Sequence, residues 1–220
     1  MNATTELQQK VSDYSYQLGQ LSNAAVASLA PSFARLPLDP YIDGDFRLRR
    51  YSNFKFIDGK LLRQPTKSFM QSSDINQYLG DVERVYAELE ESVAQSEAMV
   101  ELFDSFKAAT GLGDDAIIEV HQMRITCQRD DSSLPAPEGV HQDGFDFLGV
   151  YVMGNHDIEG GDIMLYNKPD EAPFFQEYFE AGRFVILNDR RYFHNAAPIA
   201  PLPGHDKGAW DVIVLTAHAA

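Results

Sequence analysis

The stretch EGVHQDGFDFLGVYV, residues 138–152, places a histidine and an aspartate two positions apart, just ahead of an apolar, β-rich run. Residues i and i+2 of a strand point to the same side of it. The spacing therefore predicts that His141 and Asp143 face one point, where two ligands can hold one metal ion. A third ligand has to come from another part of the chain.

The composition limits the classes to which the protein can belong. Its 220 residues fit a single domain. The net charge of −15 disfavours binding to nucleic acid and docking on an anionic membrane, because both would repel it. The single cysteine, Cys127, excludes an internal disulfide and a multi-cysteine metal site. The N-terminus has no signal-peptide pattern and no apolar run is long enough to span a bilayer, so we expect a cytoplasmic protein.

The first half of the chain shows helical patterns on either side of one strand-like segment. Residues 3–30 have the apolar spacing of a helix that Pro31 ends. Residues 46–56, FRLRRYSNFKF, alternate as a strand does and concentrate basic residues in an acidic chain. Residues 79–109 predict one or two amphipathic helices, and TGLGDD at 110–115 stops them.

The second half consists of short β-rich runs, most of them separated by loops with Pro, Gly, Asp or Asn. The runs are AIIEVHQMRITC (116–127), FLGVYVM (147–153), DIMLY (162–166), RFVILN (183–188) and DVIVLTA (211–217). Such spacing is typical of an all-β sandwich or barrel. We therefore expect one domain over residues 1–220, mainly β in an α+β arrangement. In it, a helix-rich N-terminal layer (1–115) packs on a β-barrel core (116–220).

The third ligand candidate is His194, which follows a strong strand in NDRRYFHNAAPI, residues 188–199. Two histidines and one carboxylate on one side of a metal form the facial triad of non-haem Fe(II) oxygenases, with the other side open. The triplet H-x-D is a weak signal by itself, since Asp143 and Gly144 can simply form a turn. The β-rich surroundings, the strand-end position of His194 and the turn at 160–162 favour the metal site.

Five segments occur in an order that makes a family resemblance specific. They are EVHQMR (119–124), EGVHQDGFDF (138–147), IEGGDIMLY (158–166), NDRRYFHNAAPI (188–199) and WDVIVLTA (210–217), preceded by RLRRYSNFKF (47–56). Over roughly residues 45–218 the chain resembles the small bacterial Fe(II)/2-oxoglutarate-dependent dioxygenases of the isoleucine 4-hydroxylase and biofilm/stress/motility protein A type.

The resemblance implies a double-stranded β-helix, the jelly-roll fold of the cupin-like barrels. It implies hydroxylation of a free aliphatic L-amino acid, or a related oxidation, with Fe(II), 2-oxoglutarate and O₂. Carried over by position, the metal ligands and catalytic centre are His141, Asp143 and His194.

The chain departs from that family at the start of its last strand. There the family usually has an arginine that pairs with the far carboxylate of 2-oxoglutarate, and this chain has Trp210. An indole cannot form that bidentate pair, so we expect it to form an apolar wall. Arg124 matches a basic position of the family and is the favoured replacement, although an ordinary ion-pair role suits it equally. Lys207 and Arg129 are further candidates, and for Lys207 a solvated loop position is the simpler interpretation.

The substrate carboxylate also needs a cation, and residues 46–56 supply the candidates. Arg47, Arg49 and Arg50 are predicted to reach over the mouth of the barrel, although a structural basic strand explains them as well. Phe145, two residues after Asp143, is the predicted aromatic contact of the substrate.

Two alternatives remain open on the sequence. The same three ligands suit Zn²⁺ with an open water site, which would indicate a hydrolase or lyase. Trp210 alternatively fits a stress-related homologue that has lost or altered its use of 2-oxoglutarate.

Overall fold

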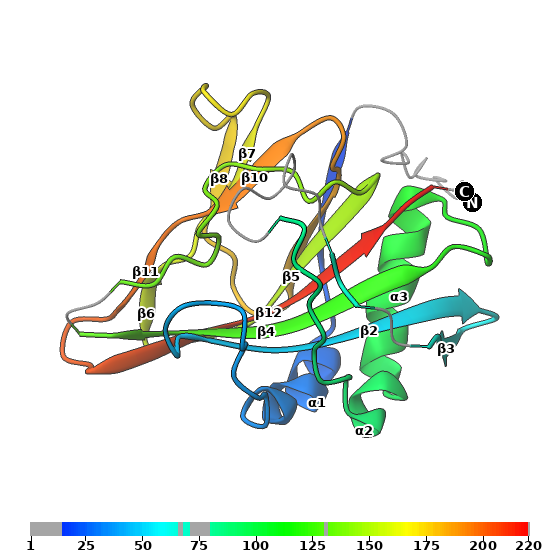
Figure 1. Cartoon of the computed structure of the whole chain (residues 1–220), viewed down its shortest axis with the longest axis horizontal. Coiled ribbons are helices and arrows are strands. Elements are labelled where there is room, and N and C mark those ends of the chain that lie inside the picture. The colour runs from blue at the N-terminus through cyan, green and yellow to red at the C-terminus, as the bar shows by residue number, and fades with distance from the viewer. Residues whose placement is uncertain (1–14, 66–67, 71–79, 130–131, 220) are drawn as a thin grey trace, which may run out of the picture.

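β-Strands dominate the computed structural model, which describes residues 15–65, 68–70, 80–129 and 132–219 (Figure 1). The largest unit is a seven-stranded antiparallel sheet with the order β1-β9-β5-β12-β4-β2-β3. Its strands are β1 (Tyr16–Gln20), β2 (Arg47–Ile57), β3 (Lys60–Arg63), β4 (Ile118–Gln128), β5 (Phe147–His156), β9 (Arg183–Asn188) and β12 (Lys207–Ala217).

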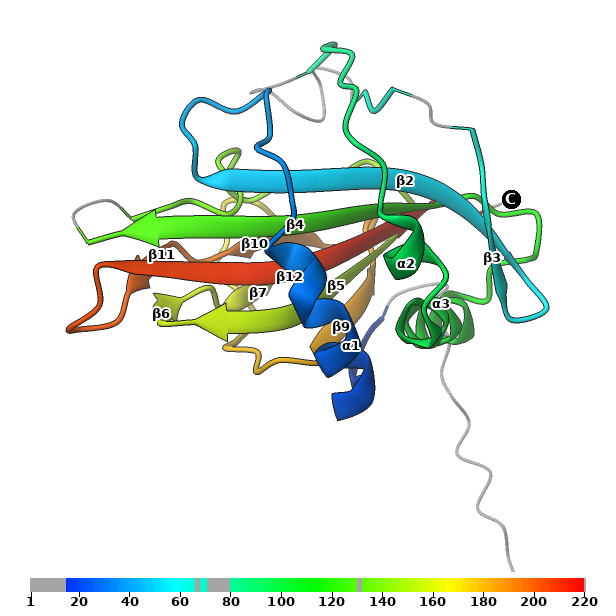
Figure 2. The ribbon, with the colours of Figure 1, turned by 90° about the horizontal axis from the view of Figure 1, so that it is seen from below.

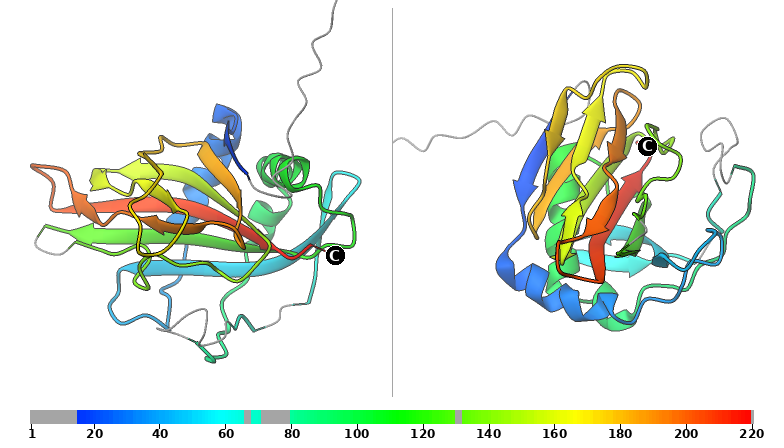
Figure 3. Two further views of the ribbon diagram at one scale, coloured as in Figure 1. Left: turned by 90° about the horizontal axis from the view of Figure 1, so that it is seen from above. Right: turned by 90° about the vertical axis from the view of Figure 1, so that its left-hand side faces the viewer.

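Two smaller antiparallel sheets lie against one face of the large sheet, as the left view of Figure 3 shows in yellow and orange. One has the order β10-β7-β8 and the other pairs β11 with β6. Their strands are β6 (Ile158–Gly160), β7 (Ile163–Tyr166), β8 (Phe175–Glu177), β10 (Phe193–Ala196) and β11 (Ile199–Pro201). A buried apolar cluster joins the two layers, with Leu165 of β7 packed among Leu148, Val185 and Val212 of the large sheet.

The helices cover the other face of the large sheet (Figure 2). They are α1 (Asn23–Phe33), α2 (Glu91–Ala94) and α3 (Glu97–Thr110). The side chain of Ser96 caps the first turn of α3, and Gly111 ends the helix in the left-handed conformation, with φ of 73°. Phe103 and Phe106 of α3 are fully buried against this face.

The central strands are therefore buried on both faces, which explains why they read as continuous apolar runs. In β5, Leu148 and Val152 belong to the cluster between the sheets, whereas Tyr151 and Met153 belong to the cluster under the helices. Side chains at alternate positions of β4, β5, β9 and β12 point into the space between the two layers. That space holds the candidate site.

The predicted strands of the second half are confirmed as β4, β5, β7, β9 and β12, and residues 46–56 are confirmed as the strand β2. The expected helix at 3–30 is partly wrong. Its first residues lie outside the described part, residues 16–20 pair with β9 as a strand, and the helix occupies 23–33. Pro31 lies inside α1, close enough to its end that few backbone hydrogen bonds are lost.

The helix expected from residue 79 begins only at Glu91, and residue 79 itself is not described. Residues 80–89 instead pair in an extended form. The amides of Phe69 and Arg84 each donate to the other's carbonyl, at 2.8 and 2.9 Å, and the amide of Tyr51 donates to the carbonyl of Ala87. These long-range contacts outweigh the local helical pattern.

The first 115 residues are less helical than expected, because β1, β2 and β3 all belong to the large sheet. The sheet thus draws strands from both halves of the chain. No helix of the described residues is long and apolar enough to cross a membrane.

Candidate metal centre

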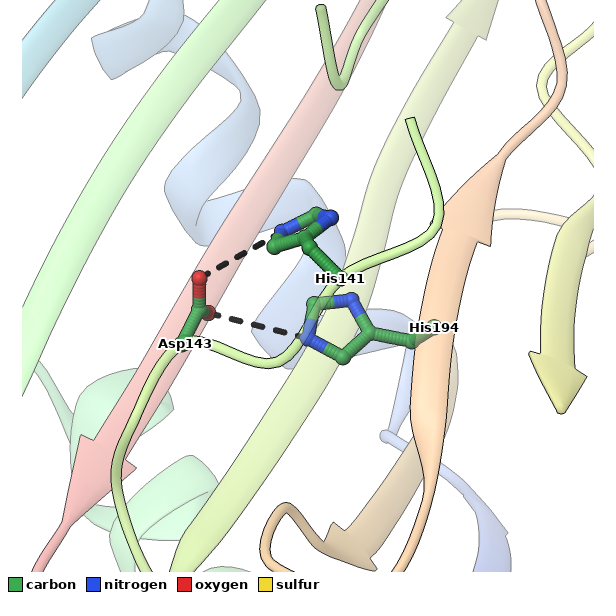
Figure 4. A group of neighbouring side chains, drawn as sticks. All are labelled: His141, Asp143 and His194. Atoms are coloured by element: carbon green, nitrogen blue, oxygen red, sulfur yellow. Dashed lines mark ion pairs between the residues drawn. The ribbon is translucent and has the colours of Figure 1, made fainter. Parts of the chain in front are cut away.

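The structure brings His141, Asp143 and His194 together, as Figure 4 shows. Their ligand atoms all lie within 4.8 Å of one another. Nε2 of His141 is 3.4 Å from Oδ1 of Asp143, and Nε2 of His194 is 3.9 Å from Oδ2 of the same carboxylate. Two imidazoles and one carboxylate on a common point form the donor set of a facial Fe(II) site.

Two backbone elements position these side chains. His194 lies in β10, and its amide and carbonyl exchange hydrogen bonds of 2.9 and 3.1 Å with those of His141. The predicted strand at 141–143 is only this single bridge, and Asp143 follows in the loop before β5. The three side chains therefore come together because His141 is bridged to β10, and not because His141 and Asp143 share one face of a strand.

The nitrogen atoms of both histidines are oriented as metal binding requires. Nδ1 of His141 donates to the carbonyl of Gly139 at 2.8 Å, which leaves Nε2, on the side of Asp143, as the nitrogen that would bind the ion. Nε2 of His194 is buried and has no hydrogen-bond partner. A buried nitrogen without a hydrogen bond is unfavourable, and a metal ion at the centre of the three residues would satisfy it. The residues present thus fit the ion.

In the metal-free protein, His141 holds a proton more tightly than an ordinary histidine does. Burial by itself would lower the pKa of His141, but the hydrogen bond and charge of Asp143 outweigh it and raise that pKa to about 9. Burial would likewise raise the pKa of Asp143, yet the two histidines hold it well below its usual range. A metal ion must displace the proton of His141, because histidine binds metals in its neutral form.

Asp189 supports the centre and was missed by the sequence reasoning. It is fully buried just after β9, and its Oδ2 accepts hydrogen bonds from the amides of Gly144 and Phe145, at 2.9 and 3.1 Å. Its Oδ1 lies 3.3 Å from Nε2 of His194. One carboxylate therefore holds the loop that carries Asp143 and also contacts a histidine ligand. The available signal was an aspartate directly after an apolar strand, five residues before His194.

The three residues open onto a cavity between the two layers of the fold. Its charged and polar lining includes Arg47, Arg49, Arg84 and His121. Most of the remaining lining is apolar and includes Ile125, Leu148, Val150, Leu165, Val185 and Val212. A mostly apolar pocket with a few converging polar groups is typical of a small-molecule site.

Of the predicted cosubstrate residues, Trp210 lines this cavity and is 4% exposed, so the apolar wall expected there is present. Arg124 does not line it. His121, Met123 and Ile125 of β4 face the cavity. Arg124 lies between the last two, so its side chain points to the other face of the sheet. There Arg124 forms a bidentate pair with Asp211, at 2.6 and 2.7 Å. The favoured anchor is therefore wrong.

The other two cosubstrate candidates also lie elsewhere. Lys207 is exposed at the first position of β12 and does not line the cavity. Arg129 pairs with Asp206 at 2.7 Å on the surface.

The predicted substrate residues divide by the two faces of β2. Arg47 and Arg49 line the cavity, whereas Arg50 points away from it, donates to the carbonyl of Glu88 at 2.8 Å and lies 3.7 Å from the Glu90 carboxylate. The alternation of a strand explains the division, so Arg50 is not a substrate contact.

The two remaining predicted residues of the cavity, Arg47 and Phe145, each contact a neighbouring side chain. Arg47 is neutralised by Asp39, with contacts of 2.8 and 2.7 Å. Phe145 lines the cavity as expected and stacks on the ring of His218, with a centroid distance of 4.8 Å.

Comparison with known proteins identifies the family. The profile of the 2OG-Fe dioxygenases matches residues 30–216. Among solved structures, a bsmA homolog from Methylobium petroleophilum PM1 matches with a TM-score of 0.75 and 24% identity, covering 90% of this chain and 82% of that one. IDO from Bacillus thuringiensis matches with a TM-score of 0.70 and 16% identity, covering 92% and 90%.

A prolyl-4-hydroxylase from Pseudomonas putida also shares the fold, with a TM-score of 0.53, 14% identity and 94% coverage of both chains. No curated protein sequence matches. The neighbours confirm the jelly-roll fold of the two facing layers. The family uses Fe(II) and 2-oxoglutarate, for which the three clustered residues provide a fitting metal site. The chain is a member of the 2OG-Fe dioxygenase family.

Proposed function

We propose that the protein uses Fe(II), 2-oxoglutarate and O₂ to hydroxylate a free aliphatic L-amino acid, with His141, Asp143 and His194 as the metal ligands. The observation that carries this proposal is the position of the three residues at a cavity lined by both arginine and apolar side chains. We further propose that it acts in the cytoplasm as a single domain.

The cavity supports a small substrate of this kind. Its apolar lining, with side chains such as Leu148 and Val185, suits an aliphatic chain, and the guanidinium groups of the same cavity suit a carboxylate. Iron, when bound, supplies the oxidising power for attack on an unactivated C–H bond. The chain's own residues hold the ion, exclude water and fix which carbon lies nearest to it.

The test is a turnover assay of the whole chain. Protein loaded with Fe(II) and 2-oxoglutarate without oxygen is exposed to O₂ and a panel of L-amino acids, and products are identified by mass spectrometry. We expect a substrate that gains one oxygen atom, with an equal amount of succinate. Products that form without O₂ or 2-oxoglutarate would indicate the hydrolase or lyase alternative, and no succinate with any amino acid would indicate lost catalysis.

Ligand variants test the metal site separately. His141→Ala, Asp143→Ala and His194→Ala should each lose most metal binding and all turnover. His205→Ala is a matched control, because this histidine is exposed and its partner is Asp157 at 3.3 Å. Full metal occupancy in all three variants, with their folds intact, would contradict the site.

A further inference from the structure

Arg49 is a buried cation with no carboxylate partner in the part of the chain that the structure describes. It lies on β2, is 7% exposed and lines the cavity. Its Nη2 contacts Nδ1 of His121, its Nη1 lies 3.5 Å from the hydroxyl of Tyr86, and its Nε is buried without a hydrogen-bond partner. Within the described residues, no carboxylate lies at ion-pair distance from it. A buried charge without a counterion is strongly unfavourable, so this position points to an anionic ligand.

Aromatic rings and a neutral histidine hold the guanidinium of Arg49 in place. Its carbon Cζ lies 4.5 Å from the ring centre of Tyr86 and 5.4 Å from that of Phe69. Burial, and then the charge of Arg49 itself, lower the pKa of His121 well below its usual value, so this ring is neutral and its Nδ1 accepts. These contacts fix the guanidinium without neutralising it, which is the arrangement of a preformed ligand site.

Two neighbouring arginines differ from Arg49 in having a carboxylate partner. Arg47 on the same face of β2 pairs with Asp39, and Arg124 on the adjacent strand pairs with Asp211. On β12 of the same sheet, two strands from β2, position 210 offers the indole of Trp210 and no cation.

We propose that Arg49 anchors a ligand carboxylate in this cavity, donating from its unpartnered Nε–H and from the N–H groups of Nη1 and Nη2 that its neighbours leave unused. This proposal rests on the proposed function and deepens it. Two ligands of that reaction carry such a group: 2-oxoglutarate, whose second carboxylate does not bind the metal, and the amino acid substrate. The chemistry of recognition is the same for both, namely a charge-assisted bidentate pair with a planar guanidinium.

The test is calorimetric titration of the full chain with Mn²⁺ in place of Fe²⁺, so that no turnover occurs. The ligands are 2-oxoglutarate, 2-oxobutanoate and, with 2-oxobutanoate present, L-isoleucine. 2-Oxobutanoate has the same metal-binding end as 2-oxoglutarate but no second carboxylate. The variants are Arg49→Gln and Arg49→Lys. Arg50→Gln is the matched control, one residue along the same strand and facing away from the cavity.

Arg49→Gln should weaken one carboxylate ligand by about tenfold to a hundredfold, and Arg49→Lys should also weaken it, because lysine lacks the fork. Loss for 2-oxoglutarate with unchanged 2-oxobutanoate assigns the anchor to the cosubstrate. Loss for L-isoleucine with both 2-oxo acids unchanged assigns it to the substrate. Unchanged affinity for all three ligands in both variants would overturn the proposal.

Thermal unfolding separates this role from a structural one. Removing an unpaired buried charge should leave the ligand-free midpoint of Arg49→Gln at or above that of the wild type, while the rise of the midpoint with the affected ligand disappears. A lower midpoint with unchanged ligand affinity would show a structural role and overturn the proposal. If wild-type protein with Mn²⁺ binds neither 2-oxo acid, the proposed function fails, and the anchor fails with it.

Discussion

Asp189 should contribute both to the stability of the fold and to the affinity for the metal. Its Oδ2 accepts two hydrogen bonds from buried amides, at 2.9 and 3.1 Å, and each bond to a charged group contributes about 1.5–3 kcal/mol. Asp189→Ala removes both, a loss of about 3–6 kcal/mol from a total stability of about 5–15 kcal/mol. Asp189→Asn keeps an acceptor oxygen, so its bonds become neutral ones and the loss falls to about 2–3 kcal/mol.

Asp189 also acts on the metal centre, because its Oδ2 holds the loop that carries the ligand Asp143 and its negative Oδ1 lies 3.3 Å from Nε2 of His194, the nitrogen that would bind the ion. Loss of such a supporting carboxylate typically weakens metal binding by about 10- to 100-fold, and Asp189→Asn should show this. Urea unfolding measures the stability, and titration with Mn²⁺ or Co²⁺ measures the affinity. Asp206→Asn, at an exposed surface pair, is the control. Wild-type metal affinity and an unchanged urea midpoint in Asp189→Asn would refute the reasoning.

Three further predictions each concern one side chain: His141, Arg124 or Cys127. The folded pKa of His141 is raised to about 9 by Asp143, above its unfolded value of about 6.5. The metal-free protein should therefore lose stability as the pH rises from about 6.5 to 9, while its affinity for the metal increases. Melting curves in chelator measure the stability, and Mn²⁺ titrations at both pH values measure the affinity. A melting temperature in chelator that stays constant or rises over this range contradicts the prediction. Arg124→Gln should lower stability by about 1–3 kcal/mol but leave 2-oxoglutarate affinity unchanged by calorimetry, whereas a tenfold loss would restore it as the anchor. Burial raises the pKa of the Cys127 thiol, which is 2% exposed, so thiol reagents should modify it only after denaturation; rapid labelling of the native protein would disprove this.

The sequence was sufficient for β2 and for five strands of the second half, and with the family resemblance it singled out the three candidate metal ligands. β-Rich runs between turn residues identify β4, β5, β7, β9 and β12, and β5 and β9 are mostly apolar because they are buried on both faces. The residue types and order of His141, Asp143 and His194 carry the chemistry in the sequence itself, since only a few side chains bind iron.

The tertiary structure alone decided the partners of each side chain. Residues 80–89 have a helical pattern, yet they lie extended because contacts with Phe69 and Tyr51, far away in the chain, outweigh local preference. Arg49 and Arg124 look alike in the sequence, but one faces the cavity and the other pairs with Asp211 on the opposite side of the sheet. Strand register places a side chain on one face or the other, and a shift of one residue reverses it. Register is set by long-range pairing, which no local pattern of residues contains.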